Sequence, residues 1–167
     1  VQHFMDRMEN SQELLDHKLE LLEPIYPNIM NLSIPARMTD SITLSTMHGC
    51  PPDEIERIAT YLITERKLHT AVKLNPTLLG PEQLRQILNH DLGYDSVHVP
   101  EAAFDHDLKY PDALNLINNL QSHADETGVE FGLKLTNTLE VENHRPIFPE
   151  KESMMYLSGR ALHPISI

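Results

Sequence analysis

The feature that most constrains this fold is a strand-like segment that passes directly into a helix-like segment between residues 41 and 67. Apolar and hydroxyl residues alternate through 41–45, which is the period of a strand with two unlike faces. Apolar residues then recur at helical spacing from Ile55 to Ile63. Pro51 and Pro52 stand just before this stripe, where proline suits the first turn of a helix. The sequence therefore predicts a βα unit with a polar corner between its two elements.

The same pattern recurs along the chain. Further strands are predicted at residues 70–75, 96–100 and 129–135, with helices at 82–89 and from near 111 to 128 and an acidic loop at 101–107. Strands that alternate with helices in this way need crossover connections, which give a parallel sheet. We therefore expect an α/β fold of parallel βα repeats, either an open sheet or part of a (β/α)8 TIM barrel.

Residues 1–40 are predicted to form a helical lead-in and connector. Apolar residues at helical spacing among charges indicate one or two amphipathic helices within 1–23, and three prolines disfavour regular structure in 23–40. Residues 41–167 then hold the βα repeats. The chain begins with Val and ends in an apolar stretch, so we expect it to be a fragment of a longer chain.

The net charge and the single cysteine limit which partners and which cellular setting we expect for this chain. A net charge of -12 without a basic cluster argues against nucleic acid and against an anionic membrane surface. No apolar run is long enough to span a bilayer. A single cysteine indicates a reducing, cytoplasmic setting. The unpaired edge of a partial parallel sheet would favour pairing with a second copy of the chain.

Two predicted strand ends carry similar segments, Lys73 to Leu78 (KLNPTL) and Lys134 to Leu139 (KLTNTL). Ligands of parallel α/β proteins bind at the carboxyl ends of the strands, where both segments lie. A lysine within an apolar strand is costly to bury unless an anionic or electron-rich group meets it. Lys73 and Lys134 are therefore predicted to hold a flavin, a phosphate or a carboxylate. The alternative is that both are ion-paired or reach out to solvent at the rim of the sheet.

Two other candidate sites are less specific. Cys50 precedes a helix whose N-terminus favours a thiolate, with His48 as the nearest base, but a lone cysteine is more often a small buried hydrophobe. His98, Glu101 and His106 have the side chains of a divalent metal site. Their spacing matches no metal-binding motif, and a solvated surface explains them equally well.

Several of these segments resemble known flavin barrels. The segments at 44–49 (LSTMHG), 72–76 (VKLNP), 135–138 (LTNT) and 158–164 are similar, in order and rough spacing, to the FMN barrels of dihydroorotate and dihydropyrimidine dehydrogenases. The closer resemblance is to YgfK-type selenate reductase subunits, through residues 43–52, 72–80, 104–109, 134–139 and 158–162. It runs from about Ser41 to the end of the chain.

The resemblance implies an FMN site. In the dehydrogenases, the residues matching Lys73, Asn137 and Thr138 contact FMN. With the second lysine, the strand-end asparagine and the Ser-Gly loop, the predicted cofactor-binding residues are Lys73, Asn75, Lys134, Asn137, Thr138, Ser158 and Gly159. The proton-transferring cysteine of the dehydrogenases falls on Thr46, so no catalytic residue is assigned. Met155 and Tyr156 replace a glycine pair and are predicted to crowd the flavin.

For the whole protein, the resemblance implies a cytoplasmic multi-domain oxidoreductase with FAD and iron-sulfur clusters outside this region. Its partners would be other domains of the same chain or separate redox subunits. The alternative is a barrel without catalysis that serves as a scaffold for electron-transfer domains, which the substitutions at Thr46, Met155 and Tyr156 favour.

Overall fold

The computed structural model describes residues 2–46, 49–144 and 147–167, and the chain divides into two compact units, Val1–Asp40 and Ser41–Ile167. The first unit contains helices α1 (Gln2–Glu9) and α2 (Gln12–Leu22) and a short 3-10 helix, η1 (Pro27–Asn31). Within this unit the backbone N–H of Ala36 donates to Oε1 of Gln12 at 2.8 Å, which attaches the connector to α2.

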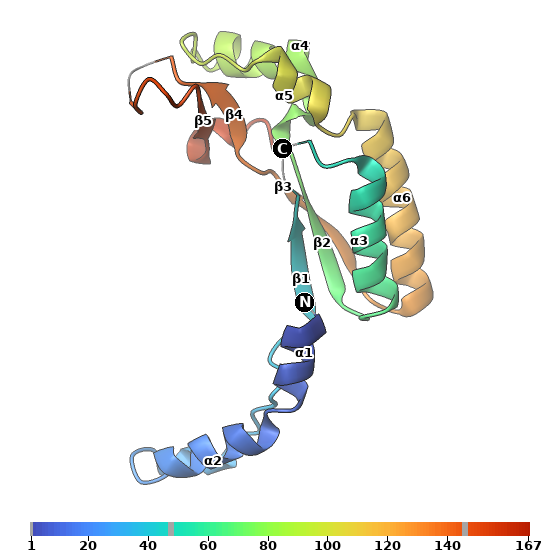
Figure 1. Ribbon diagram of the computed structural model, residues 1–167, viewed down its shortest axis with the longest axis vertical. Helices are drawn as coiled ribbons and strands as arrows, with labels where there is room; N and C mark the ends of the chain where they lie inside the picture. The colour runs from blue at the N-terminus through green and yellow to red at the C-terminus, as the bar shows by residue number, and fades with distance from the viewer. Residues whose placement is uncertain (1, 47–48, 145–146) are drawn as a thin grey trace. The chain divides into compact units, whose positions relative to one another are not determined.

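The second unit is built on a three-stranded parallel sheet (Figure 1). Its order is β1 (Ser41–Ser45), β2 (His69–Leu74) and β3 (Phe131–Leu135). The predicted parallel sheet of βα repeats is therefore confirmed. The register places Ser45, Lys73 and Lys134 in one row across the three strands, with their side chains on the same face.

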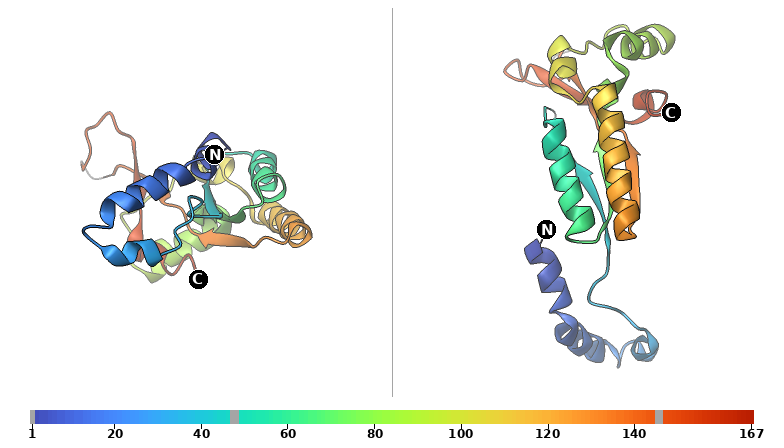
Figure 2. Two further views of the ribbon diagram at one scale, coloured as in Figure 1. Left: turned by 90° about the horizontal axis from the view of Figure 1, so that it is seen from below. Right: turned by 90° about the vertical axis from the view of Figure 1, so that its right-hand side faces the viewer.

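Helices α3 (Pro52–Thr64) and α6 (Tyr110–Thr127) lie side by side over one face of the sheet (Figures 1 and 2). The apolar stripe of α3 and the alternate residues of β2 meet in a core of fully buried side chains, among them Ile63, Val72, Leu116 and Leu120. Gly128 ends α6 in the left-handed conformation (φ 71°) and donates its N–H to the carbonyl of Ala124, as the sequence predicts for a C-terminal cap.

The opposite face of the sheet carries small and polar side chains. Ser41, Thr43 and Ser45 are exposed on β1, and Ala71 and Gly132 occupy the middle of the neighbouring strands. Within the described part of residues 41–167, both helices that contact the sheet most closely pack on the other side. The row that contains the two lysines therefore lies on this open face.

A second group of elements lies beyond the carboxyl ends of the strands (Figure 1). It comprises α4 (Pro81–Arg85), a π-helical turn at Gln86–Asp91, α5 (Glu101–His106), the antiparallel pair β4 (Leu139–Glu142) and β5 (Met154–Leu157), and the 3-10 helix η4 (Gly159–Leu162). These elements share a core of their own that includes Leu84, Leu88, Phe104, Leu139 and Val141.

Two predicted elements are wrong. Residues 96–100 are irregular rather than a strand, because within this segment only the carbonyl of His98 bonds to β4, accepting the N–H of Glu142 at 2.8 Å. The apolar residue there, Val99, is buried in the second core instead of a sheet. Residues 101–106, predicted as a loop, form α5, whose buried Ala103 and Phe104 face the same core.

The architecture is that of a partial barrel of parallel βα repeats with an added antiparallel pair. No helix among the described residues combines the length and apolarity that crossing a bilayer demands.

Candidate functional site

A pocket of about 280 Å³ opens at the carboxyl ends of β2 and β3. Three segments form its walls: the end of β2, the turn between β3 and β4, and the segment that follows β5. The lining residues are Lys73, Leu135, Thr136, Asn137, Thr138, Ser158, Gly159, Leu162, His163 and Ser166. Of the seven predicted cofactor-binding residues, the structure thus brings five to one pocket, and Asn75 and Lys134 lie outside its lining.

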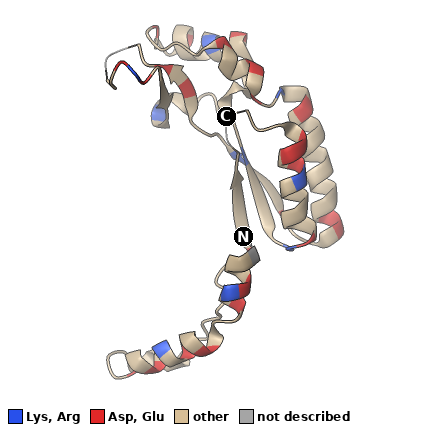
Figure 3. Ribbon diagram, viewed as in Figure 1, with Lys and Arg blue, Asp and Glu red and all other residues tan. Residues whose placement is uncertain are grey.

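Lys73 is the positive charge in the wall of this pocket. Its side chain is half-buried on the central strand, and it forms no hydrogen bond or ion pair with any described residue. Lys134 is its register partner on β3, about 4.8 Å away along the sheet, and is exposed and likewise unpaired among the described residues. Figure 3 shows blue on the three-stranded sheet towards its carboxyl ends. Two adjacent unpaired cations favour an anionic or electron-rich group beside them.

Asn75 has a buried acceptor with no donor. Its side chain is 7% exposed, and its Oδ1 atom is buried without a hydrogen-bond partner among the described residues. Residue 75 is still extended (φ -87°, ψ 147°), so strand alternation points its side chain to the same side as Lys73. Leaving such a group unsatisfied costs about 1–3 kcal/mol.

Asn137 joins the ends of all three strands. Its backbone N–H donates to the carbonyl of Leu74 at 2.7 Å, and its Nδ2 donates to the carbonyl of Thr46 at 3.3 Å. Its Oδ1 accepts the backbone N–H of Thr138 at 3.0 Å. The side chain that the resemblance assigns to FMN therefore also holds the strand ends together, and the Thr138 hydroxyl beside it lines the pocket.

The far wall is formed by residues 158–166. Gly159 begins η4 at a positive φ of 76°, a conformation that disfavours other residues, and places Ser158 against the pocket. The Ser166 hydroxyl donates to the carbonyl of Leu162 at 2.9 Å and lies 3.4 Å from Oγ1 of Thr136. Sequence reasoning missed His163 and Ser166, although it placed a loop over the site at Ser158 to Pro164.

The other candidates gain little from the structure. Burial raises the pKa of the Cys50 thiol above its ordinary value, and the carboxylates of Glu54 and Asp53 raise it further, so the group is a neutral thiol near pH 7. Its proposed base, His48, lies outside the described residues. Within the described part of the chain, no three His, Cys, Asp or Glu side chains are grouped as a metal site would need. Glu101 instead pairs with Arg85 at 2.7 Å.

The residues predicted to crowd a flavin do not reach the pocket. Met155 packs against the second core, and Tyr156 is 58% exposed opposite Glu140 on the β4–β5 pair. Neither is among the residues that line the pocket. The expected crowding of a flavin stays a prediction, although β5 ends before this pocket wall begins.

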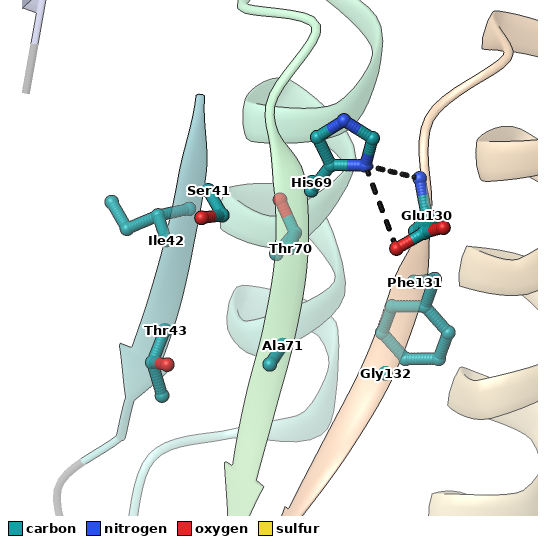
Figure 4. Close-up of a pocket in the computed structure, with 9 residues that line it drawn as sticks. All are labelled: Ser41, Ile42, Thr43, His69, Thr70, Ala71, Glu130, Phe131 and Gly132. Carbon is teal, nitrogen blue, oxygen red and sulfur yellow. Dashed lines mark hydrogen bonds and ion pairs between the residues drawn. The ribbon is translucent and has the colours of Figure 1, made fainter. Parts of the chain in front are cut away.

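A second pocket, of about 290 Å³, lies on the strands at their amino ends (Figure 4). Two of its polar side chains bond to the backbone: the hydroxyl of Thr70 donates to the carbonyl of Leu68 at 2.9 Å, and His69 accepts a backbone N–H. The backbone N–H of Glu130 donates to Nδ1 of His69 at 2.9 Å, and the Glu130 carboxylate lies 4.0 Å from the same atom. In TIM barrels this end of the strands contributes stability rather than chemistry.

Comparison with known proteins identifies the family. The family described as "Oxidoreductase YgfK, N-terminal TIM-barrel domain" matches residues 1–167. Two curated relatives, both named "Putative oxidoreductase YgfK", come from Escherichia coli strain K12 and from Escherichia coli O157:H7. Each is 50% identical over 134 residues, which is 80% of this chain and 13% of the relative, so the chain spans only a small part of their length. No solved structure matches. The chain belongs to the family of the N-terminal TIM-barrel domain of the oxidoreductase YgfK.

Proposed function

We propose that this chain supplies the FMN-binding part of a cytoplasmic, multi-domain YgfK-type oxidoreductase of the selenate reductase type, with FMN at the pocket between Lys73 and Ser158. FAD and iron-sulfur clusters would lie in other domains of the same chain or in partner redox subunits, and the barrel would begin at Ser41. The observation that carries the proposal is Lys73, an unpaired and half-buried cation at the carboxyl end of the central strand.

The residues present fit the ring system of a flavin. Its electron-rich edge calls for a cation, which Lys73 provides, and its ring carbonyls call for donors, which the Thr138 and Ser158 hydroxyls provide. The pocket, at about 280 Å³, is at the small end of the range of about 300–1,000 Å³ for ligand sites. We therefore assign it the ring and not the whole nucleotide.

When bound, FMN would supply electron or hydride transfer. Lys73 would stabilise negative charge on the ring, with Lys134 adding to the positive potential from the neighbouring strand. Asn137 would keep the three strand ends at fixed positions through its bonds to Leu74 and Thr46. Thr46 carries a hydroxyl, which is too weak an acid to replace the cysteine of the dehydrogenases, so no residue is assigned to proton transfer.

Purification of the full-length protein tests this proposal. We expect the absorbance of bound flavin in the purified protein, or saturable binding when FMN is added to flavin-free protein. Absence of both would refute the FMN site. Ser158→Ala tests whether FMN binds in this pocket. The variant removes one hydrogen-bond donor from the pocket wall and should weaken FMN binding by about three- to ten-fold.

The second candidate is a scaffold that docks electron-transfer domains, a partner subunit or a second copy of the chain. Two observations favour it. Thr46 stands where the dehydrogenases have their proton-transferring cysteine, and β1 and β3 lie at the edges of the three-stranded sheet, where another chain can pair. Lys73→Met separates the two functions in the full-length protein. Turnover with an artificial electron acceptor should fall if the barrel holds FMN, whereas unchanged turnover in a folded variant would support the scaffold.

A further inference from the structure

Asp107 is a buried carboxylate that the proposed FMN chemistry does not use. It follows α5, is 5% exposed, and accepts two hydrogen bonds from different parts of the chain. The backbone N–H of Gly49 donates to its Oδ1 at 3.1 Å, and the hydroxyl of Thr77 donates to its Oδ2 at 2.7 Å. Burying a carboxylate is costly unless donors of this kind compensate it.

The two donors belong to the loops that follow β1 and β2. Gly49 lies in the corner between β1 and α3, at a φ of 78° that favours glycine. Thr77 is 5% exposed in the 3-10 helix η2 (Pro76–Leu79), which starts immediately after Asn75. The two oxygens of a carboxylate have a fixed separation, so one side chain sets the distance between the corner after β1 and the turn after β2.

Each of these loops also reaches the pocket residues. The corner after β1 begins at Thr46, whose carbonyl accepts the Asn137 side chain at 3.3 Å. The turn after β2 follows Leu74, whose carbonyl accepts the backbone N–H of Asn137 at 2.7 Å. Displacement of either loop would therefore move a group that borders the proposed site.

We propose that Asp107 is a positioning residue for the carboxyl-end pocket: by bonding to Gly49 and Thr77 it fixes the β1 and β2 loops, and through them Asn137 and Asn75. This inference rests on the proposed FMN site. An asparagine can keep both contacts, because its oxygen accepts from Gly49 and its NH₂ donates to the Thr77 oxygen once that hydroxyl has rotated.

The test uses the full-length protein with FMN as the probe and compares Asp107→Ala, Asp107→Asn and Thr77→Val. The control is Asp105→Ala, which removes an exposed carboxylate on α5, two residues before Asp107. We expect Asp107→Ala to weaken FMN binding by about ten-fold or more and to shift the visible spectrum of bound FMN, because a lost pair of buried bonds displaces the loops. Asp107→Asn and Asp105→Ala should stay within about three-fold of wild type, and Thr77→Val should fall between.

Unchanged FMN affinity and spectrum in a folded Asp107→Ala variant would overturn the inference. If that variant does not fold, Thr77→Val decides by the same two measurements. Hydrogen exchange of the Gly49 peptide separates this inference from the FMN proposal. If the wild-type protein binds no FMN, the FMN proposal fails, and the role of Asp107 is then decided by hydrogen exchange at Gly49. Faster exchange in Asp107→Ala than in Asp107→Asn supports the proposal that Asp107 positions the loops. Equal exchange in the two variants refutes that proposal.

Discussion

The two ends of the parallel sheet carry pockets of nearly equal volume and opposite chemistry. At the amino ends the pocket of about 290 Å³ is lined by strand residues alone or by residues next to them, and His69 and Glu130 are bonded to each other (Figure 4). At the carboxyl ends the pocket of about 280 Å³ is lined mainly by loops, and Lys73 has no partner among the described residues. The volume of a pocket therefore does not show whether it is a functional site. Polar groups without hydrogen-bond partners in its wall are the better indicator.

The difference follows from how parallel strands are connected. Each βα loop leaves the sheet at a carboxyl end, so residues distant in sequence converge there and can be left without partners inside the protein. Asn75 and Lys73 are of this kind, and both cost stability. Natural proteins keep such costs mainly at functional sites.

The strongest test of this comparison substitutes one polar residue at each end of the parallel sheet. Lys73→Met should weaken FMN binding by about ten-fold or more, because it removes the cation that faces the ring. His69→Gln, at the amino ends, should leave the affinity within about two-fold. Titration of FMN into the full-length protein, followed by flavin fluorescence, measures both. Equal losses in the two variants would mean that the sheet responds as a whole and that the ends do not differ.

Asn75→Leu tests the cost of the orphaned acceptor. It replaces a buried group that lacks a donor with an apolar one of similar size, so the unfolding free energy of the flavin-free protein should stay constant or rise by up to about 1 kcal/mol. FMN affinity should stay within about two-fold of wild type, because Asn75 lies outside the pocket lining. Urea denaturation and FMN titration give the two quantities. A marked loss of stability would show that Asn75 has a structural partner.

The parallel βα repeats could be predicted from the sequence because they depend on the local spacing of apolar residues. The alternation in β1 and β2, the stripe of α3 and the Gly128 cap all depend on neighbours a few residues away, and all are confirmed. The prediction of a strand at residues 96–100 was wrong because a strand also needs a partner strand, which local periodicity does not reveal. Val97 and Val99 have the alternation of a strand, but within this segment only the carbonyl of His98 bonds to a described strand, β4, and Val99 is buried in the second core.

The site was predictable only in part. Lys73 and the Asn137–Thr138 pair stand at strand ends, where the motif and the topology agree. His163, Ser166 and the carboxylate of Asp107 could not be found, because their roles depend on loops that pack beside the pocket from distant parts of the chain. Lys134 was correctly placed beside Lys73 by the repeated motif, yet it lies on an edge strand and outside the pocket lining.

At the amino ends, the contact between His69 and Glu130 should contribute to stability alone. His69→Phe removes the acceptor of the Glu130 N–H and should lower the unfolding free energy by about 0.5–1.5 kcal/mol without changing FMN affinity. Glu130→Gln is the control, because its exposed carboxylate at 4.0 Å should be worth less than about 0.5 kcal/mol. A His69→Phe variant that loses FMN binding would assign function to this end as well.

The smallest expected effect concerns Cys50, which decides whether the carboxyl-end corner holds a nucleophile. Because burial and the carboxylates of Glu54 and Asp53 raise the pKa of this thiol, the midpoint of its alkylation by iodoacetamide should lie at higher pH in the folded protein than in the urea-unfolded protein. The folded protein should therefore react more slowly than the urea-unfolded protein near pH 8. Glu54→Gln removes one of the carboxylates and should move the midpoint slightly downwards. A midpoint at lower pH than in the unfolded protein would mean that the helix N-terminus outweighs burial, and Cys50 would then be a reactive thiolate.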